Sequence, residues 1–132
     1  MNKTPMIVVE ISPGELIDKI TILEIKSERM TQPEKLANVA VELRTLREAL
    51  EAAAQESAEL SRLTSRLKRV NEKLWEIEDG IRDCERKQDF GDRFIQIARA
   101  EYLNNDERAV IKREINELLG SRLMEEKSYE AY

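Results

Sequence analysis

The sequence predicts a mainly α-helical protein of one domain, because a helix-favouring composition coincides with long runs of helical periodicity. Charged residues make up 37% of the 132 residues and aromatic residues only 5%. Gly and Pro are scarce and are absent from Glu34 to Asp79, which is typical of helical bundles and coiled coils. The hydrophobic content of 41% exceeds that of disordered chains, and residues 1–132 match the usual size of one domain.

The N-terminal part predicts a short strand followed by a helix. Residues 6–11 form a β-branched run, which is typical of a strand. In Ser12-Pro13-Gly14-Glu15, Ser12 suits the N-cap, Pro13 the first helical position and Glu15 a capping box. The helix is expected to run to about Met30 and to be covered on more than one side. Its apolar positions are Leu16, Ile17, Ile20, Ile22, Leu23, Ile25 and Met30.

Two further stretches carry apolar residues at alternating spacings of about three and four, which keeps one seam facing a partner helix. A break at Thr31-Gln32-Pro33 precedes them. The first seam comprises Leu36, Val39, Leu43, Leu46, Leu50 and Ala53. The second comprises Leu60, Leu63, Leu67, Val70, Leu74, Ile77, Ile81 and Cys84.

The two seams do not share a register, and the slip falls around Gln55-Glu56-Ser57. Either the chain turns there and the two stretches form a long antiparallel helical hairpin, or one long coiled-coil helix carries a local defect. The hairpin is favoured, although the absence of Gly and Pro is an argument against it.

The C-terminal part predicts two more helices. Residues 88–92 are typical of a turn, after which Asp92 can cap a helix that carries Phe94 and Tyr102. Residues 104–106 (Asn-Asn-Asp) predict a second turn with N-cap residues, and Gly120 is placed to end the last helix. We expect the tail, residues 121–132, either to pair as a short strand with residues 6–11 or to be loose.

Composition excludes several classes of function. A net charge of −5 disfavours nucleic-acid binding, which requires clustered positive charge. The chain has no histidine, so it lacks the commonest general base and metal ligand, and a single cysteine allows no internal disulfide. No apolar stretch is long enough to span a membrane, and no leader pattern is evident at the N-terminus. We therefore expect a cytoplasmic protein with no cofactor.

One helical face carries Glu72, Glu76, Asp79 and Asp83, whose spacing could hold Mg²⁺. On a helical wheel these acids lie almost opposite the apolar seam, so the interpretation favoured here is a solvated face without metal. The sequence also matches the ExxE…ExxD pattern of all-α nucleotide pyrophosphohydrolases. That match uses Glu56, Glu59, Glu76 and Asp79, and Glu48 with Glu51 fits its first half equally well.

Other residues are interpreted as structural. The basic ridge Arg62, Arg66, Arg69 and Lys73 is expected to pair with acids one helical turn away. Trp75 is expected to be covered by the helix that carries Phe94 and Tyr102, and Cys84 to be an inert core thiol. Gly14 is attributed to capping geometry. The residues proposed for a core or an interface are Leu67, Leu74, Trp75, Ile77 and Ile81.

Two segments resemble a family of small bacterial proteins of unknown function. They are residues 11–26, beginning Ile-Ser-Pro-Gly-Glu-Leu-Ile-Asp-Lys, and the stretch from Asn71 through Leu74-Trp75-Glu76-Ile77-Glu78-Asp79 to residues 116–121. Members are sometimes encoded near sugar-transferase and surface-polysaccharide genes. The resemblance implies a bacterial origin and a role in surface-glycan assembly, and it carries no catalytic residues.

Two functions follow as hypotheses. The first is a non-enzymatic accessory or scaffold protein that acts by helix-mediated association with itself or with another protein. The alternative is a Mg²⁺-dependent nucleotide or nucleotide-sugar pyrophosphohydrolase that uses helix carboxylates. The absence of histidine and the wheel position of the acids favour the first.

Overall fold

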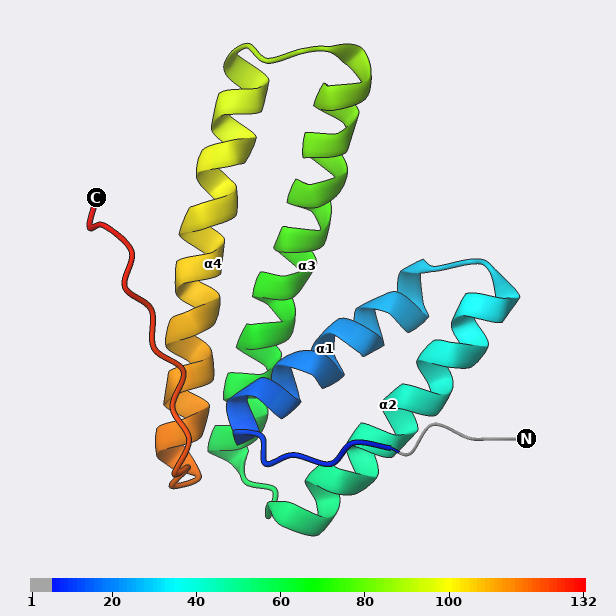
Figure 1. The fold of residues 1–132 in the computed structure, drawn as a ribbon, viewed down its shortest axis with the longest axis vertical. Helices are drawn as coiled ribbons and strands as arrows, with labels where there is room; N and C mark the ends of the chain where they lie inside the picture. Colours follow the sequence, from blue (N-terminus) through cyan, green and yellow to red (C-terminus); the bar gives the residue numbers. More distant parts are fainter. Residues whose placement is uncertain (1–5) are drawn as a thin grey trace.

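Residues 6–132, the part that this computed structural model describes, contain four helices: α1 (Pro13–Arg29), α2 (Pro33–Ala53), α3 (Ala58–Lys87) and α4 (Asp92–Leu118). α3 and α4 form a long antiparallel hairpin (Figure 1). α1 contacts both of them near the lower end of the hairpin, and α2 packs against α1. The mainly α prediction is confirmed. No helix within residues 6–132 is both long and apolar enough to cross a bilayer.

Serine caps begin two of the helices. The Ser12 hydroxyl accepts a hydrogen bond from the Glu15 backbone N–H at 3.2 Å, as predicted for α1. The Ser57 hydroxyl accepts one from the Leu60 N–H at 3.1 Å, so a cap starts α3 although no Gly or Pro precedes it. The predicted break around residues 55–57 is therefore confirmed, and one long helix through this region is excluded.

The hairpin was predicted between the wrong helices, α2 and α3. α2 and α3 do not pack side by side; α2 packs on α1, and α3 pairs with α4. α1 packs against α2 and also against the α3/α4 hairpin. It can do so because its apolar residues occupy more than one stripe, as the sequence predicts. One core cluster joins α1 and α2 through Leu16, Ile20, Leu23, Val39 and Leu43. The other joins α1, α3 and α4 through Ile17, Leu60, Leu63, Leu67, Val70, Ile111 and Ile115.

The predicted turn at residues 104–106 was also wrong, since α4 runs through it without interruption. The Asn104 side chain donates to the Ala100 carbonyl at 2.8 Å, and Asn105 donates to the Glu101 carboxylate at 2.7 Å. These bonds to the preceding turn satisfy the amides within the helix, so they do not act as caps. Asp92 is not a cap either, because the N-cap of α4 is Gly91, whose backbone N–H donates to the Asp89 carboxylate at 3.1 Å.

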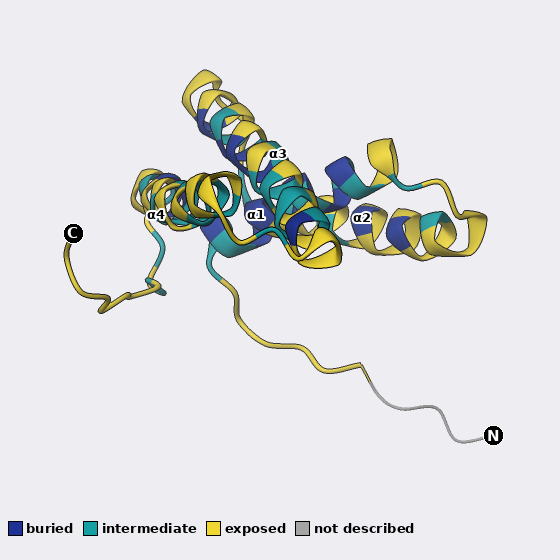
Figure 2. Ribbon diagram, turned by 90° about the horizontal axis from the view of Figure 1, so that it is seen from above, coloured by how far each residue is buried: buried dark blue, intermediate teal, exposed yellow. Residues whose placement is uncertain are grey.

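The predicted strand pairing of the two ends was wrong. Residues 6–11 are extended but belong to no strand, and Met6 to Val9 are 73–90% exposed. This segment leads away from the helices (Figure 2). The tail after Gly120 forms no strand and follows α4 through side-chain contacts, including an ion pair between Arg113 and Glu126. Pairing fails because the tail is held by side chains rather than by a backbone ladder.

α3 and α4 end in the same way, with a residue in the left-handed region and a Schellman pattern of hydrogen bonds. In α4 this residue is Gly120 (φ 65°), as the sequence predicts, and the Ser121 N–H donates to the Asn116 carbonyl at 2.8 Å. In α3 the residue is Gln88 (φ 55°), and the Asp89 N–H donates to the Cys84 carbonyl at 2.9 Å. The Cβ atom of Gln88 makes this left-handed conformation sterically unfavourable, and glycine would avoid that cost.

Replacement of Gln88 by Gly is therefore expected to stabilise the protein by about 1 kcal/mol. The measurement is the free energy of unfolding in urea. Gln96→Gly, a matched change on an exposed residue within α4, should destabilise the protein by a similar amount, because Gly is unfavourable in a helix interior. Equal effects of the two substitutions would contradict the role assigned to Gln88.

Candidate functional site

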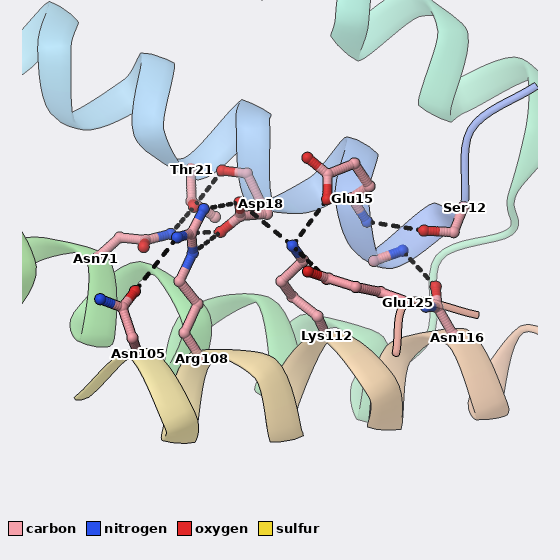
Figure 3. A network of polar contacts seen from close by, with 11 residues as sticks. Ser12, Glu15, Asp18, Thr21, Asn71, Asn105, Arg108, Lys112, Asn116 and Glu125 are labelled. Atoms are coloured by element: carbon pink, nitrogen blue, oxygen red, sulfur yellow. Dashed lines mark hydrogen bonds and ion pairs between the residues drawn. The ribbon is translucent and has the colours of Figure 1, made fainter. Parts of the chain in front are cut away.

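A polar cluster lies buried where α1 meets α3 and α4, and Asp18 of α1 is at its centre (Figure 3). The Asp18 side chain is only 1% exposed. Arg108 of α4 binds both of its oxygens, with Nε 2.9 Å from Oδ1 and Nη2 on Oδ2. Asn71 of α3 donates to Oδ1 at 2.9 Å and to the Thr21 hydroxyl at 2.9 Å. One carboxylate therefore joins three helices.

Lys112, one turn after Arg108 on α4, extends this cluster toward the start of α1. Its side chain is 9% exposed, and its ammonium lies 2.7 Å from the Glu15 carboxylate and 3.9 Å from that of Asp18. A third carboxylate comes from the tail, where Glu125 lies 3.0 Å away. Lys112 thus connects α4, α1 and the tail through charged contacts (Figure 3).

Gly14 permits α1 and α4 to approach closely. Its backbone N–H donates to the Asn116 side chain at 2.7 Å. A Cβ atom at position 14 would lie 2.4 Å from the Lys112 carbonyl oxygen and 2.8 Å from the Asn116 amide oxygen. The capping explanation of Gly14 was therefore incomplete, since contact with α4 requires the glycine.

The cluster is electrostatically satisfied. Within residues 6–132, every buried side-chain nitrogen or oxygen has a hydrogen-bond partner. Hydrogen bonding to Asp18 raises the pKa of Arg108. Burial opposes the charge of Lys112, but hydrogen bonds to Glu15 and Glu125 and the nearby Asp18 outweigh it and raise the pKa of Lys112. The Lys112 ammonium in turn lowers the pKa of Glu125, so Arg108, Lys112 and Glu125 stay ionised near neutral pH.

Two cavities flank Arg108. A polar cavity of about 220 Å³ is lined by Glu15, Asn105, Arg108, Ala109, Lys112, Glu125 and Lys127. A more apolar groove of about 250 Å³ lies between α1, α3 and α4, with Ile22, Ile25, Leu74 and Trp75 among its lining residues. Trp75 is half-buried beside this groove rather than fully covered by α4.

Three of the four acids of the predicted carboxylate face are engaged in ion pairs, and the fourth, Asp79, is exposed. Arg29 of α1 lies 3.9 Å from Glu72 and 3.6 Å from Glu76. Asp83 pairs with Arg86, Lys87 and Arg93, and hydrogen bonds from Arg93 and Lys87 lower the pKa of Asp83 to about 2. Within residues 6–132, no three His, Cys, Asp or Glu side chains are placed to share a metal ion.

The pyrophosphohydrolase pattern is not brought together within the chain. Glu59 and Glu76 both lie on α3, and at 1.5 Å of rise per residue they are about 25 Å apart. Glu59 pairs with Arg62 at 2.6 Å. The two halves of the pattern therefore cannot bind one ion in a single chain.

The remaining predicted residues have structural environments. Leu67 and Cys84 are completely buried, whereas Leu74, Ile77 and Ile81 are half-buried. In the basic ridge, Arg62 pairs with an acid one turn away, as predicted, but Arg66 pairs across the hairpin with Glu114 of α4 at 3.0 Å.

Sequence reasoning missed the polar cluster. Its α4 members Arg108, Lys112 and Asn116 recur every four residues, and the last two directly follow the apolar residues Ile111 and Ile115. That regular flank was the available signal. In a chain that is 37% charged, the same pattern is equally typical of a solvent-exposed flank. These residues are covered only because α1 packs against them, which the pattern does not indicate.

The fold and this cluster define a small four-helix protein with an ion-paired interior junction. A family model matches residues 7–132, and the chain belongs to that family, described as a family of unknown function (DUF6165). Comparisons with curated proteins and with solved structures each gave no match.

Gly14→Ala is expected to destabilise the protein by about 2–4 kcal/mol, because the new methyl group overlaps the α4 backbone and displaces the bond to Asn116. Chemical denaturation measures the change. Gly80→Ala is the matched control, since a Cβ there meets only the flexible end of Ile97, at 3.0 Å. The gain in helix propensity offsets that contact, and similar losses in the two variants would contradict the proposed close approach.

A second prediction concerns the attachment of the tail. The pKa of Glu125 lies below its ordinary value of 4.5 because Lys112 stabilises the carboxylate. This pair therefore contributes stability above pH 4.5, and the contribution is lost as the pH falls through the Glu125 pKa. An NMR titration of the Glu125 side chain should give a midpoint below 4.5. A midpoint at or above 4.5 would show that the carboxylate is not held on Lys112.

Proposed function

We propose that this protein is a non-enzymatic helical association module whose α3/α4 hairpin binds a second copy of the chain. The observation that carries the proposal is the poor coverage of one part of that hairpin, residues 77–103, which we term the arm. Cys84 is the one buried residue of the arm, all of which lies in the described part of the chain. The other apolar side chains of the arm are half-buried or exposed.

The arm differs sharply from the base of the same hairpin. At the base, α1 covers the pair of helices, and residues such as Leu63 and Ile115 are at most 2% exposed. Among the described residues, no third helix covers the two helices beyond α1. The tail follows α4 there (Figure 1), and its Tyr132 ring packs against that of Tyr102. Phe90 and Ile95 are both 49% exposed, and Leu103 is 43% exposed. Two helices alone cannot enclose an apolar seam, which favours completion by other helices.

A second copy fits this surface for geometric reasons. Two antiparallel hairpins related by a twofold axis form a four-helix bundle, the common solution for such seams. A twofold interface uses the same patch on both subunits, so no separate complementary surface needs to exist. The half-buried Ile77 and Ile81 would gain coverage in that arrangement. The free energy of association would come mainly from burying these aliphatic groups.

The charged groups support binding over catalysis. Three of the four acids of the predicted metal stripe, Glu72, Glu76 and Asp83, are paired with arginine or lysine. The buried cluster likewise holds its charged side chains in ion pairs with one another, an arrangement that favours a structural role for these groups. A cytoplasmic location, a single domain and a contribution to bacterial surface-glycan assembly complete the proposal.

Self-association gives the direct test. At micromolar concentration, light scattering coupled to size exclusion should give a mass near twice the 15.4 kDa of the chain. Ile95→Glu should shift the mass to that of the monomer, because an unpaired carboxylate would be buried in the arm interface. A wild-type monomer over the whole micromolar range would refute the proposal.

Val41→Glu provides the matched control. Val41 is 56% exposed, a value similar to that of Ile95, but it lies on α2 and outside the arm. We expect this variant to keep the wild-type mass. Circular dichroism on both variants shows whether the helices remain folded. Dissociation by both substitutions would place the interface elsewhere.

A further inference from the structure

The polar cavity beside Arg108 has the chemistry of an anion site. Almost all of its exposed lining is polar, and three of its side chains are cations: Arg108, Lys112 and Lys127. Two acids, Glu15 and Glu125, also line it. The volume of about 220 Å³ exceeds the roughly 30 Å³ of one water several-fold, so a small ion fits.

Arg108 is held in one orientation, and some of its guanidinium N–H groups are not used by the bonds that hold it. Its Nε and Nη2 groups hold the buried Asp18, which Asn71 holds from the other side. The remaining Nη1 group makes only a long contact, 3.5 Å, with Asn105. A guanidinium that is oriented by one carboxylate and still has free N–H groups is suited to bind a second oxyanion.

Lys112 supplies a second positioned cation on the same side of α4, one turn from Arg108. Its side chain is nine-tenths buried, so it loses little conformational freedom when a ligand binds. One of its partners is Glu125, which belongs to the tail and not to the helical core. Lys112 therefore already binds a carboxylate that is carried by a segment without helix or strand.

We propose that Arg108 and Lys112 form a binding site for a small oxyanion, a phosphate or a carboxylate, and that Glu125 of the tail is its intramolecular occupant. An external oxyanion takes the place of Glu125 on Lys112, reaches the free Nη1 donors of Arg108 and contacts Lys127 at the rim. The charge balance of the cavity is preserved by this exchange, because one anion replaces another.

Removal of the Glu125 charge should make the site available. In Glu125→Gln the affinity for inorganic phosphate is expected to rise at least about tenfold over wild type, since a competing charge-assisted hydrogen bond is lost. Trp75 is the only tryptophan of the chain and shares a groove with Arg108, so its emission reports on binding. Calorimetry with phosphate, and separately with acetate, distinguishes the two oxyanions.

Glu126→Gln is the matched control, because Glu126 is the adjacent tail acid and pairs with Arg113 instead. It should leave the phosphate affinity unchanged. Lys127→Gln, an exposed tail substitution that leaves the core intact, should lower the affinity of the Glu125→Gln variant. Binding of either oxyanion that depends on Glu125 and Lys127 supports the proposal.

Three results would overturn it: equal gains in Glu125→Gln and Glu126→Gln, no binding of either anion to folded Glu125→Gln, or the same emission change with sodium chloride at matched ionic strength. The last result would indicate charge screening alone. The test is independent of self-association, because Ile95→Glu can be titrated in the same way and should retain the site.

Discussion

The arrangement of the helices depends on the buried carboxylate of Asp18. A charge removed from water is tolerated only when several partners compensate it, and those partners come from two of the three helices that α1 touches. Arg108 approaches from α4 and Asn71 from α3, both at 2.9 Å from Oδ1. Apolar contacts alone would allow α1 to slide along the hairpin. The directional bonds to one carboxylate fix its position, and loss of a single partner from such a buried pair typically costs about 3–5 kcal/mol.

The same contact explains why other features occur where they do. With α1 fixed at Asp18, its first turn meets the backbone of α4, and only glycine fits at position 14. Glu15 then lies next to Lys112 and pairs with it at 2.7 Å instead of completing the capping box. The capping box and the contact with α4 therefore compete for the Glu15 side chain. The contact with Lys112 is favoured because its ammonium is nearly buried and a carboxylate of α1 stabilises that charge more than a cap bond stabilises the helix start.

Local signals sufficed to predict the helices, and long-range contacts decided the rest. Ser12, Pro33 and Gly120 mark helix ends through their own backbone preferences, and the break before Ser57 followed from the seam registers. The pairing of α2 with α1 could not be predicted, because the seams specify that a partner exists without specifying which one. The Asn104–Asn105 pair was misread since its amides bond equally well within a helix. Asp18 was missed because a single acid beside Ile17 gives no sign that α1 is enclosed on that side.

The molecule consequently divides into a fixed base and an incompletely covered arm. At the base, three helices enclose both a seam and a charged junction, and the tail adds a carboxylate to that junction. Beyond α1, the same two helices continue with one buried residue among residues 77–103. A hairpin that extends beyond its core gains little stability, because every added residue loses conformational entropy and buries little apolar area in return. In the dimer that we propose, a second hairpin would cover the arm and remove this imbalance. The proposed anion site lies where α1 packs on the hairpin, so the two proposed contacts would use separate parts of it.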